Sequence, residues 1–455
     1  MHQDEEHQES HAPSLSPQLD TITATYFTAG CAAEYLTEAT MTLGTTLLQV
    51  RSSQLKDTLD KKFIREEEPP EISLERRPAL GRTKRQAIAI GDNKHLWLNG
   101  VNYYFDSTTK NKTKKAFLRA AKAWEKDTCI NFTENAKATD AIHVMDVGDV
   151  CVSNIGKKGG PQNLSLPSGC ELFGHAAHEI GHALGLHHTQ NRPDRDTYVT
   201  VHNESMEEDY RRQFDKYKFG EFVEYGMPYD YGSIMHYESN RSNPTMTPTE
   251  KNYMGTLGSP MISFIDLSLI NEHYNCKRIC TKTRNPAKCE NGGFPHPRDC
   301  SKCICPGGYG GRLCDKRPDD LGAILNATTG WQHLYMTHYN LHKDIDYLKR
   351  TYWIKPSSPA DQNVKIQVKM SIINRNLDVE GCVFAGVEIK TNADQTVTGH
   401  RLCSIEDLGH VLESPCLSSG NSSHVVPVIF YSYNHPSIMI AAGLDYRYVD
   451  CDGGQ

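Results

Sequence analysis

Fifteen cysteines limit how this chain can fold more than any other feature of its sequence. Six of them fall between Cys280 and Cys314, a window too short to bury a sufficient hydrophobic core on its own. Such density is typical of a disulfide framework formed in an oxidising compartment. Cys31 lies in a polar N-terminal stretch, and without it fourteen cysteines remain, an even number. The cysteines therefore predict a cross-linked, secreted protein.

Asn-x-Ser/Thr triplets, the acceptor pattern for N-glycosylation, agree with secretion. They begin at Asn111, Asn131, Asn163, Asn203, Asn240, Asn326 and Asn421. Residues 1–30 nevertheless lack the basic and then apolar stretches of a signal peptide. We expect a secreted protein whose given start is a mis-assigned gene start; a cytosolic protein is the alternative.

Charge and hydropathy exclude two other classes of function. A net charge of −7 and a pI near 6.3 provide no basic surface for nucleic acid or for an anionic membrane. No part of the sequence approaches the run of about 18 apolar residues that a membrane helix needs. We therefore expect no nucleic-acid partner and no membrane span.

Changes in composition divide the chain into regions. The regions are 1–85, 86–277, 278–316 and 320–451. The first is polar and ends in Arg82-Thr83-Lys84-Arg85, a match to the sites cut by furin-like processing proteases. We expect a pro-region that is removed by cleavage between Arg85 and Gln86; an ordinary solvated basic loop is the alternative.

Hydrophobic periodicity predicts three elements. Apolar residues recur at helical spacing through 113–126 and again through 172–184. Apolar and polar residues alternate from Val364 to Ile372, the period of a half-buried strand.

The run from His178 to His188 predicts a metal site. Residues four apart on an α-helix have Cβ atoms about 5–6 Å apart, so His178 and His182 can bind one ion together. Gly185 lets the chain leave the helix because glycine tolerates positive φ, and His188 can then return as a third ligand. Glu179 lies beside the pair, well placed to hold a metal-bound water.

Two neighbouring histidines, His175 and His187, fall outside this register, and we interpret both as ordinary polar residues. The motif extended to the third histidine is the metzincin signature, which also requires a methionine turn beneath the metal. Ser233-Ile234-Met235-His236-Tyr237 supplies that turn.

These motifs resemble the astacin family of zinc metalloendopeptidases over about residues 86–277. The run Arg192-Pro193-Asp194-Arg195-Asp196 is similar to the family's extended signature, and the turn around Met235 looks like its Met-turn. The resemblance implies an α+β metzincin domain, in which a twisted mixed sheet and an active-site helix form two lobes around a zinc cleft. It also implies one Zn²⁺ per chain on the three histidines.

The resemblance implies hydrolysis of internal peptide bonds in extracellular proteins or peptides. We expect Glu179 to take a proton from the zinc-bound water and to pass it to the leaving amine. The resemblance also implies that Tyr237 is a fifth zinc ligand at rest, which swings away in the transition state to share the developing oxyanion with zinc. We expect an extended substrate to pair with an edge strand in residues 152–170. The alternatives are a catalytically silent matrix or adhesion protein, which would usually lack one of these residues, and a non-proteolytic zinc hydrolase.

Resemblances to known families also imply disulfide pairs. The resemblance to astacins implies Cys129–Cys276 and Cys151–Cys170 in the catalytic domain. Residues 278–316 resemble an EGF-like module, which implies Cys280–Cys300, Cys289–Cys303 and Cys305–Cys314, although spacing alone permits fifteen connectivities. A zinc-binding cysteine cluster is the alternative for this region.

Residues 320–451 resemble a CUB-like domain, an all-β sandwich that would carry Cys382 and Cys403 and dock to matrix or other proteins. The partners of Cys416 and Cys451 stay open.

Two departures from the astacin pattern concern the zymogen. Thr189 stands where members commonly carry a glutamate that pairs with the buried mature N-terminus, and residues 1–85 lack the family's Phe-x-Gly-Asp motif.

Overall fold

The structure is a computed structural model that describes most of the chain after residue 92. The described ranges are 93–218, 224–338, 346–357, 363–374, 379–417, 425–433 and 440–451. The expected pro-region, its cleavage point between Arg85 and Gln86, Cys31 and Asn421 lie outside them. None of the helices in these ranges is both long and apolar enough to cross a membrane.

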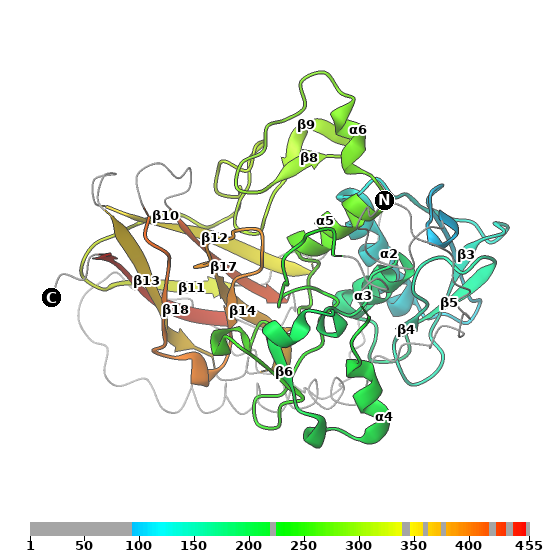
Figure 1. Ribbon diagram of the computed structural model, residues 1–455, viewed down its shortest axis with the longest axis horizontal. Helices are drawn as coiled ribbons and strands as arrows, with labels where there is room; N and C mark the ends of the chain where they lie inside the picture. The colour runs from blue at the N-terminus through cyan, green and yellow to red at the C-terminus, as the bar shows by residue number, and fades with distance from the viewer. Residues whose placement is uncertain are drawn as a thin grey trace, which may run out of the picture. The chain divides into compact units, whose positions relative to one another are not determined.

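A five-stranded mixed sheet begins the described chain (Figure 1). Its strands are β1 (Val101–Phe105), β2 (Phe132–Glu134), β3 (Ala141–Met145), β4 (Val152–Ser153) and β5 (Pro161–Ser165). In the order β2-β1-β3-β5-β4, the first four strands are parallel, and β4 pairs antiparallel with β5 at one edge.

Two helices cover this sheet region: α2 (Asn111–Lys126) and α3 (Phe173–Ala183). Both lie within a residue or two of the spans that the periodicity predicts. The apolar stripe of α2 includes Phe117 and Trp124, which are fully buried. The Trp124 indole donates a hydrogen bond to the Ala177 carbonyl of α3 at 3.0 Å, so the core of this region positions α3 directly.

The remaining elements up to residue 281 are short. The strands are β6 (Val199–Val201) and β7 (Met246–Pro248), and the α-helices are α4 (Glu208–Arg211), α5 (Phe264–His273) and α6 (Lys277–Thr281). The 3-10 turns are η1 (Asn93–His95), η2 (Thr189–Asn191), η3 (Arg195–Thr197), η4 (Asn203–Ser205), η5 (Arg212–Phe214) and η6 (Lys251–Tyr253).

The cysteine-rich module that follows has one antiparallel pair, β8 (Phe294–His296) and β9 (Asp299–Ile304). Disulfides account for most of its cross-linking. The bridges of the whole described chain are Cys129–Cys276, Cys151–Cys170, Cys280–Cys300, Cys289–Cys303, Cys305–Cys314, Cys382–Cys403 and Cys416–Cys451. The last of these joins the two cysteines whose partners the sequence left open.

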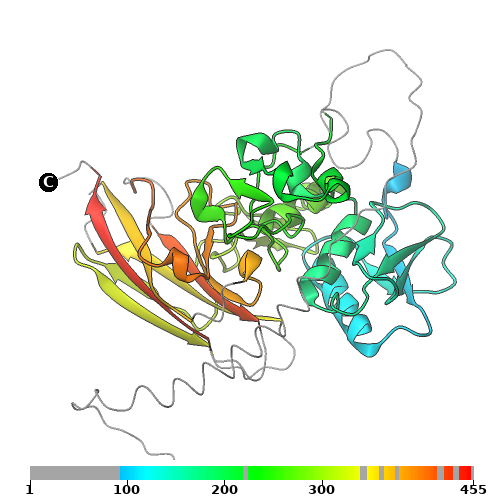
Figure 2. The ribbon, with the colours of Figure 1, turned by 90° about the horizontal axis from the view of Figure 1, so that it is seen from below.

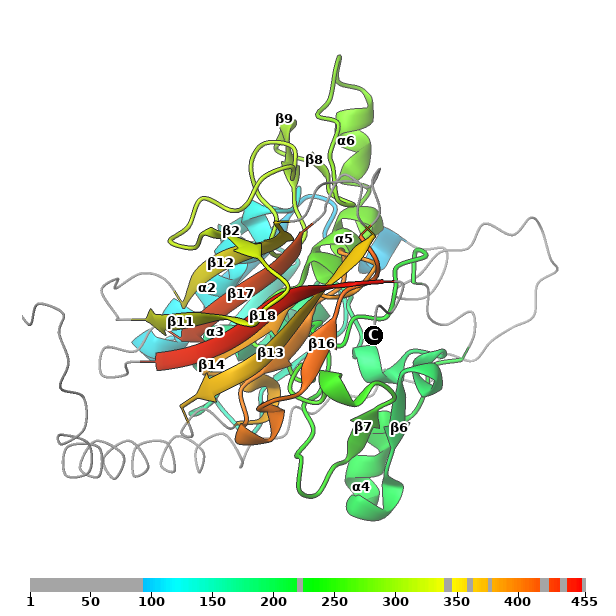
Figure 3. The same cartoon turned by 90° about the vertical axis from the view of Figure 1, so that its left-hand side faces the viewer.

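Two sheets form the C-terminal sandwich around a shared apolar core (Figure 2, Figure 3). One sheet has the order β10-β12-β17-β14-β15 and the other the order β11-β18-β13-β16. Their bounds are β10 (Ile324–Ala327), β11 (Gln332–His338), β12 (Tyr347–Pro356), β13 (Val364–Ile373), β14 (Ala385–Ile389), β15 (His400–Leu402), β16 (Val411–Glu413), β17 (Val426–Tyr433) and β18 (Ile440–Asp450). Two further 3-10 turns are η8 (Glu380–Cys382) and η9 (Ile405–Asp407).

The predicted alternation in β13 holds for most of the strand and then fails. Val364, Ile366, Val368 and Met370 are buried, but Ile372 is 50% exposed. The register against β18 shifts between Met370 and Ile372, and such a bulge turns the next side chain to the other face. The assignment of Ile372 to the core face is therefore wrong.

Candidate metal centre

The end of α3 brings the third histidine of the motif back toward the first two. Gly185 has a φ of 108°, a conformation that side-chain-bearing residues rarely adopt. Its N–H donates to the His182 carbonyl at 2.7 Å, and the Leu186 N–H donates to the Gly181 carbonyl at 2.9 Å. These bonds close the helix and redirect the chain toward His188.

The three histidines present their Nε2 atoms to one point. His188 Nε2 lies 3.1 Å from the Nε2 atoms of both His178 and His182. Nitrogen ligands at 2.0–2.1 Å around a tetrahedral zinc ion would lie about 3.3 Å apart. The spacing of these donors therefore fits a single zinc ion.

The opposite ring nitrogens of the two helical histidines are held in place. His178 Nδ1 donates to the Ile234 carbonyl at 2.7 Å, and His182 Nδ1 donates to the Leu186 carbonyl at 2.8 Å. With the proton on Nδ1, each Nε2 keeps its lone pair for a metal. Burial lowers the pKa of His178 and His188 well below the usual range and that of His182 to about 3. Neutral imidazoles are the form that binds metal.

The Met-turn supports this arrangement from beneath the helix. Gly181 lies between the two helical histidines, and a Cβ at that position would come within 2.6 Å of the Met235 sulfur. Two backbone carbonyls of the turn contact the histidine motif. The Ile234 carbonyl accepts from His178 at its start, and the Met235 carbonyl accepts from the N–H of Thr189, the residue after His188, at 3.0 Å. The turn thus fixes the orientation of the histidines.

Glu179 and Tyr237 lie close to the three histidines. Glu179 is fully buried and follows His178 directly in α3. The Tyr237 ring lies 4.3 Å from the His188 ring, centroid to centroid, and its backbone N–H donates to Gln190 Oε1 at 3.0 Å. Tyr237 and His178 line one cleft of about 280 Å³.

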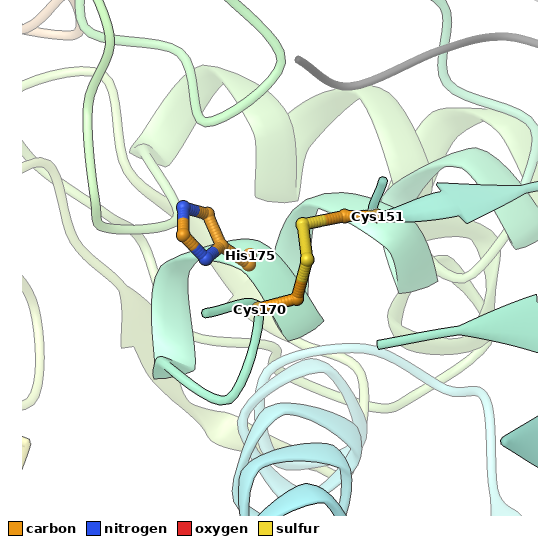
Figure 4. Close-up of side chains that lie close together, drawn as sticks. All are labelled: Cys151, Cys170 and His175. Carbon is orange, nitrogen blue, oxygen red and sulfur yellow. A yellow bond between two sulfur atoms is a disulfide. The ribbon is translucent and has the colours of Figure 1, made fainter. Parts of the chain in front are cut away.

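A second group of metal-ligating residue types, Cys151, Cys170 and His175, lies beside the N-terminal end of α3 (Figure 4). Its two sulfurs are bonded to each other at 2.05 Å, so neither offers a thiolate. His187 is half-buried, and its ring centroid lies 4.4 Å from that of Tyr217. Burial lowers the pKa of His187 to about 4.

One set of cleft residues has no signal in the sequence. Besides residues near α3 and the Met-turn, the C-terminal sandwich lines the cleft with Tyr347, Val379, Glu380, Val383, Phe384 and Tyr433. These residues lie more than 150 positions after His188, and local periodicity says nothing about such distant contacts.

The sequon asparagines in the described ranges are all exposed, namely Asn111, Asn131, Asn163, Asn203, Asn240 and Asn326.

Comparison with known proteins places the chain in a family. The astacin family model (peptidase family M12A) matches residues 89–275. Zinc metalloproteinase nas-31 of Caenorhabditis elegans is 42% identical over 342 residues, which are 74% of this chain and 54% of that protein. Zinc metalloproteinase nas-25 of the same organism is 32% identical over 381 residues, which are 82% of this chain and 92% of that protein.

The chain thus spans about half the length of nas-31 and most of nas-25. Among solved structures, high choriolytic enzyme 1, a hatching enzyme zinc-protease from the medaka fish Oryzias latipes, is 30% identical with a TM-score of 0.39. That match covers 42% of this chain and 98% of the fish enzyme. The chain belongs to the astacin family of zinc metalloproteinases.

Proposed function

We propose that this chain is a secreted zinc metalloendopeptidase that hydrolyses internal peptide bonds of extracellular proteins. One observation carries the proposal. Three buried, neutral imidazoles converge on a point at spacings that fit zinc, with Glu179 in the same helix and Tyr237 on the same cleft. A catalytically silent scaffold would have no need to keep all five side chains.

His178, His182 and His188 would hold the ion. Three protein ligands are the number typical of catalytic zinc sites, whereas structural sites use four. When bound, zinc supplies Lewis acidity, which makes water more acidic and polarises a carbonyl group.

The chain's own residues then move the proton and stabilise charge. The Glu179 carboxylate takes a proton from the attacking water as the water oxygen bonds to the scissile carbonyl carbon. It returns that proton to the amide nitrogen as the carbon–nitrogen bond breaks. The Tyr237 hydroxyl donates a hydrogen bond to the carbonyl oxygen as negative charge develops there. The 4.3 Å between the ring centroids of Tyr237 and His188 supports this role.

An extended substrate would pair with β4. This strand lies at an edge of the sheet and pairs only with β5 among the described strands. Backbone hydrogen bonds to such an edge fix a peptide independently of its sequence.

The flanking regions complete the proposal. Residues 278–316 form an EGF-like module, which three local disulfides support, and residues 320–451 form a CUB-like domain that docks to matrix or other proteins, which the two-sheet sandwich supports. Residues 1–85 are a pro-region cleaved after Arg85 by a furin-like protease. Exposed sequon asparagines and the disulfides support secretion.

A peptide library tests the function. Incubation of the mature chain with the library, followed by N-terminal sequencing of the products, should reveal internal cleavage that a chelator abolishes and added zinc restores. Absence of any cleavage by folded protein that contains one zinc per chain would favour the silent matrix protein instead.

A further inference from the structure

The C-terminal sandwich forms part of the wall of the catalytic cleft. Six of its residues line the same cleft as His178 and Tyr237, namely Tyr347, Val379, Glu380, Val383, Phe384 and Tyr433. We propose that this wall is a specificity element, which together with the catalytic domain forms a pocket for a large apolar side chain of the substrate next to the scissile bond. The proposal rests on the peptidase function proposed above.

Buried polar contacts hold the sandwich against the segments that build the metal site. Asp230, five residues before Met235, is 1% exposed and accepts hydrogen bonds from the Thr398 N–H at 3.0 Å and hydroxyl at 3.1 Å. Arg401 donates to the Ser259 hydroxyl at 2.7 Å, and Ser259 itself lines the cleft. Because a buried polar group that loses its partner is costly, these contacts fix the wall relative to the metal site.

The two regions also meet at the rim of the cleft. A Cβ at Gly381 would come within 2.3 Å of the Gly258 carbonyl oxygen, so the two backbones touch. Nearby, Asn240 Nδ2 donates to Glu380 Oε1 at 2.6 Å. Arg241 pairs with Asp407 at 3.0 Å. The sandwich therefore contacts the catalytic domain both at the buried polar residues and at the rim of the cleft.

The chemistry of the wall favours an apolar ligand. Phe384 is 8% exposed, and Val379 and Val383 add aliphatic surface beside it. The Tyr347 hydroxyl donates to the Val383 carbonyl at 2.7 Å, inside the sandwich, and its ring lies 5.7 Å from the Tyr433 ring. Apolar and aromatic walls bind apolar side chains by removing them from water.

The charge and size of the cleft agree with this choice. Two acidic residues line the cleft, Glu238 from the catalytic domain and Glu380 from the sandwich, and Glu380 already accepts a hydrogen bond from Asn240. The volume of about 280 Å³ is just below the range for ligand pockets, about 300–1,000 Å³. It has room for one large side chain and its backbone rather than for a folded segment.

Matched peptides test the wall in the full mature chain. The peptides differ only at the two positions flanking the scissile bond, which carry Phe, Leu, Ala, Lys or Glu. Phe384→Ala should lower kcat/KM about tenfold for the Phe and Leu peptides that the wild type prefers, and less than twofold for the Ala peptides, since apolar pocket contacts give discrimination of about 10- to 200-fold. Tyr335→Ala is the matched control, because Tyr335 is an aromatic residue on β11 that is 61% exposed. It should change neither series.

Two further variants separate the pocket from folding and from catalysis. Phe384→Leu keeps an apolar wall and should retain most of the preference even if Phe384→Ala folds poorly. In a Glu179→Gln background, fluorescence anisotropy of labelled peptides should show that Phe384→Ala weakens binding of the Phe peptide about tenfold. Equal losses for all peptides, an unchanged preference in folded Phe384→Ala, or a wild-type preference for Lys or Glu would contradict the proposal. Failure of the wild type to cleave any peptide would instead contradict the peptidase function, and the binding measurement would still test the pocket.

Discussion

Thr189 Oγ1 donates a hydrogen bond to Ser233 Oγ, 2.9 Å away, and so joins the residue after the third histidine to the Met-turn. Ser233 Oγ in turn donates to Asp266 Oδ1 at 2.6 Å, and Asp266 also accepts from the Ile234 N–H at 2.8 Å. Three buried side chains thus connect the loop of His188, the Met-turn and α5. The threonine that departs from the family pattern has a structural partner here.

Thr189→Val should weaken this connection while the protein keeps its zinc. The change keeps the side-chain shape and removes the donor to Ser233, so the free energy of unfolding should fall by about 1 kcal/mol. Denaturant unfolding measures the change, and Thr200→Val on the exposed side of β6 is the control, with an effect below about 0.5 kcal/mol. Loss of zinc from folded Thr189→Val would mean that Thr189 acts on the metal site itself.

The mature N-terminus should not need an exact position. Thr189 offers no carboxylate for a buried ammonium group, and burial of an unpaired ammonium is costly. Removal of the pro-region should be needed for activity. Because the new terminus has no buried partner, forms that start at Gln86 and forms with one or two extra residues should have similar kcat/KM. A tenfold or larger loss in the extended forms would show that a fixed, buried terminus exists.

Arg401→Met should destabilise the sandwich at the place where Arg401 also binds Ser259 of the catalytic domain. Arg401 and Glu388 form a buried ion pair at 3.1 Å, with side chains 4% and 7% exposed. Loss of one partner of a buried pair costs about 3–5 kcal/mol, because the other charge stays in the interior. Scanning calorimetry should therefore show a clearly lower unfolding temperature.

Lys365→Met is the control for this change. Lys365 pairs with Glu413 at 2.6 Å at the surface, where both side chains are about a third exposed. Solvent screens such a pair, and its loss should cost less than about 1 kcal/mol. Equal shifts for the two variants would contradict a structural role for the buried pair.

Tyr237→Phe should lower kcat about 10²-fold and leave KM nearly unchanged. A hydrogen bond that forms only in the transition state affects kcat and kcat/KM together, and loss of one oxyanion donor has this magnitude. Steady-state kinetics on one peptide gives both constants. A change in KM alone would assign Tyr237 to substrate binding.

Local features of the sequence predicted local structure. The helical periodicity of α2 and α3 and the alternation of β13 depend on neighbouring residues, so they are visible without the fold. The exposed side chain of Ile372 was not predictable, because the register shift before it arises from pairing with β18. The convergence of His178 and His182 follows from helix geometry, whereas the position of His188 depends on the conformation of Gly185.

Contacts between distant segments could not be predicted in this way. The hydrogen bonds from Thr398 to Asp230 join residues 168 positions apart. Phe384 in the wall of the cleft and the bridge between Cys416 and Cys451, 35 positions apart, could not be predicted either. The first two depend on how the sandwich packs against the catalytic domain, and the bridge depends on how the sandwich itself folds. No periodicity or motif in one sequence reports that packing.

The zinc content and peptidase activity of Glu179→Gln test the central claim most directly. The three histidines remain in this variant and only the proton carrier is lost, so metal analysis should find about one zinc per chain while peptide cleavage nearly disappears. His182→Ala, the control for the ligand set, should lose both zinc and activity. A Glu179→Gln protein that retains a tenth or more of the wild-type turnover would contradict the account.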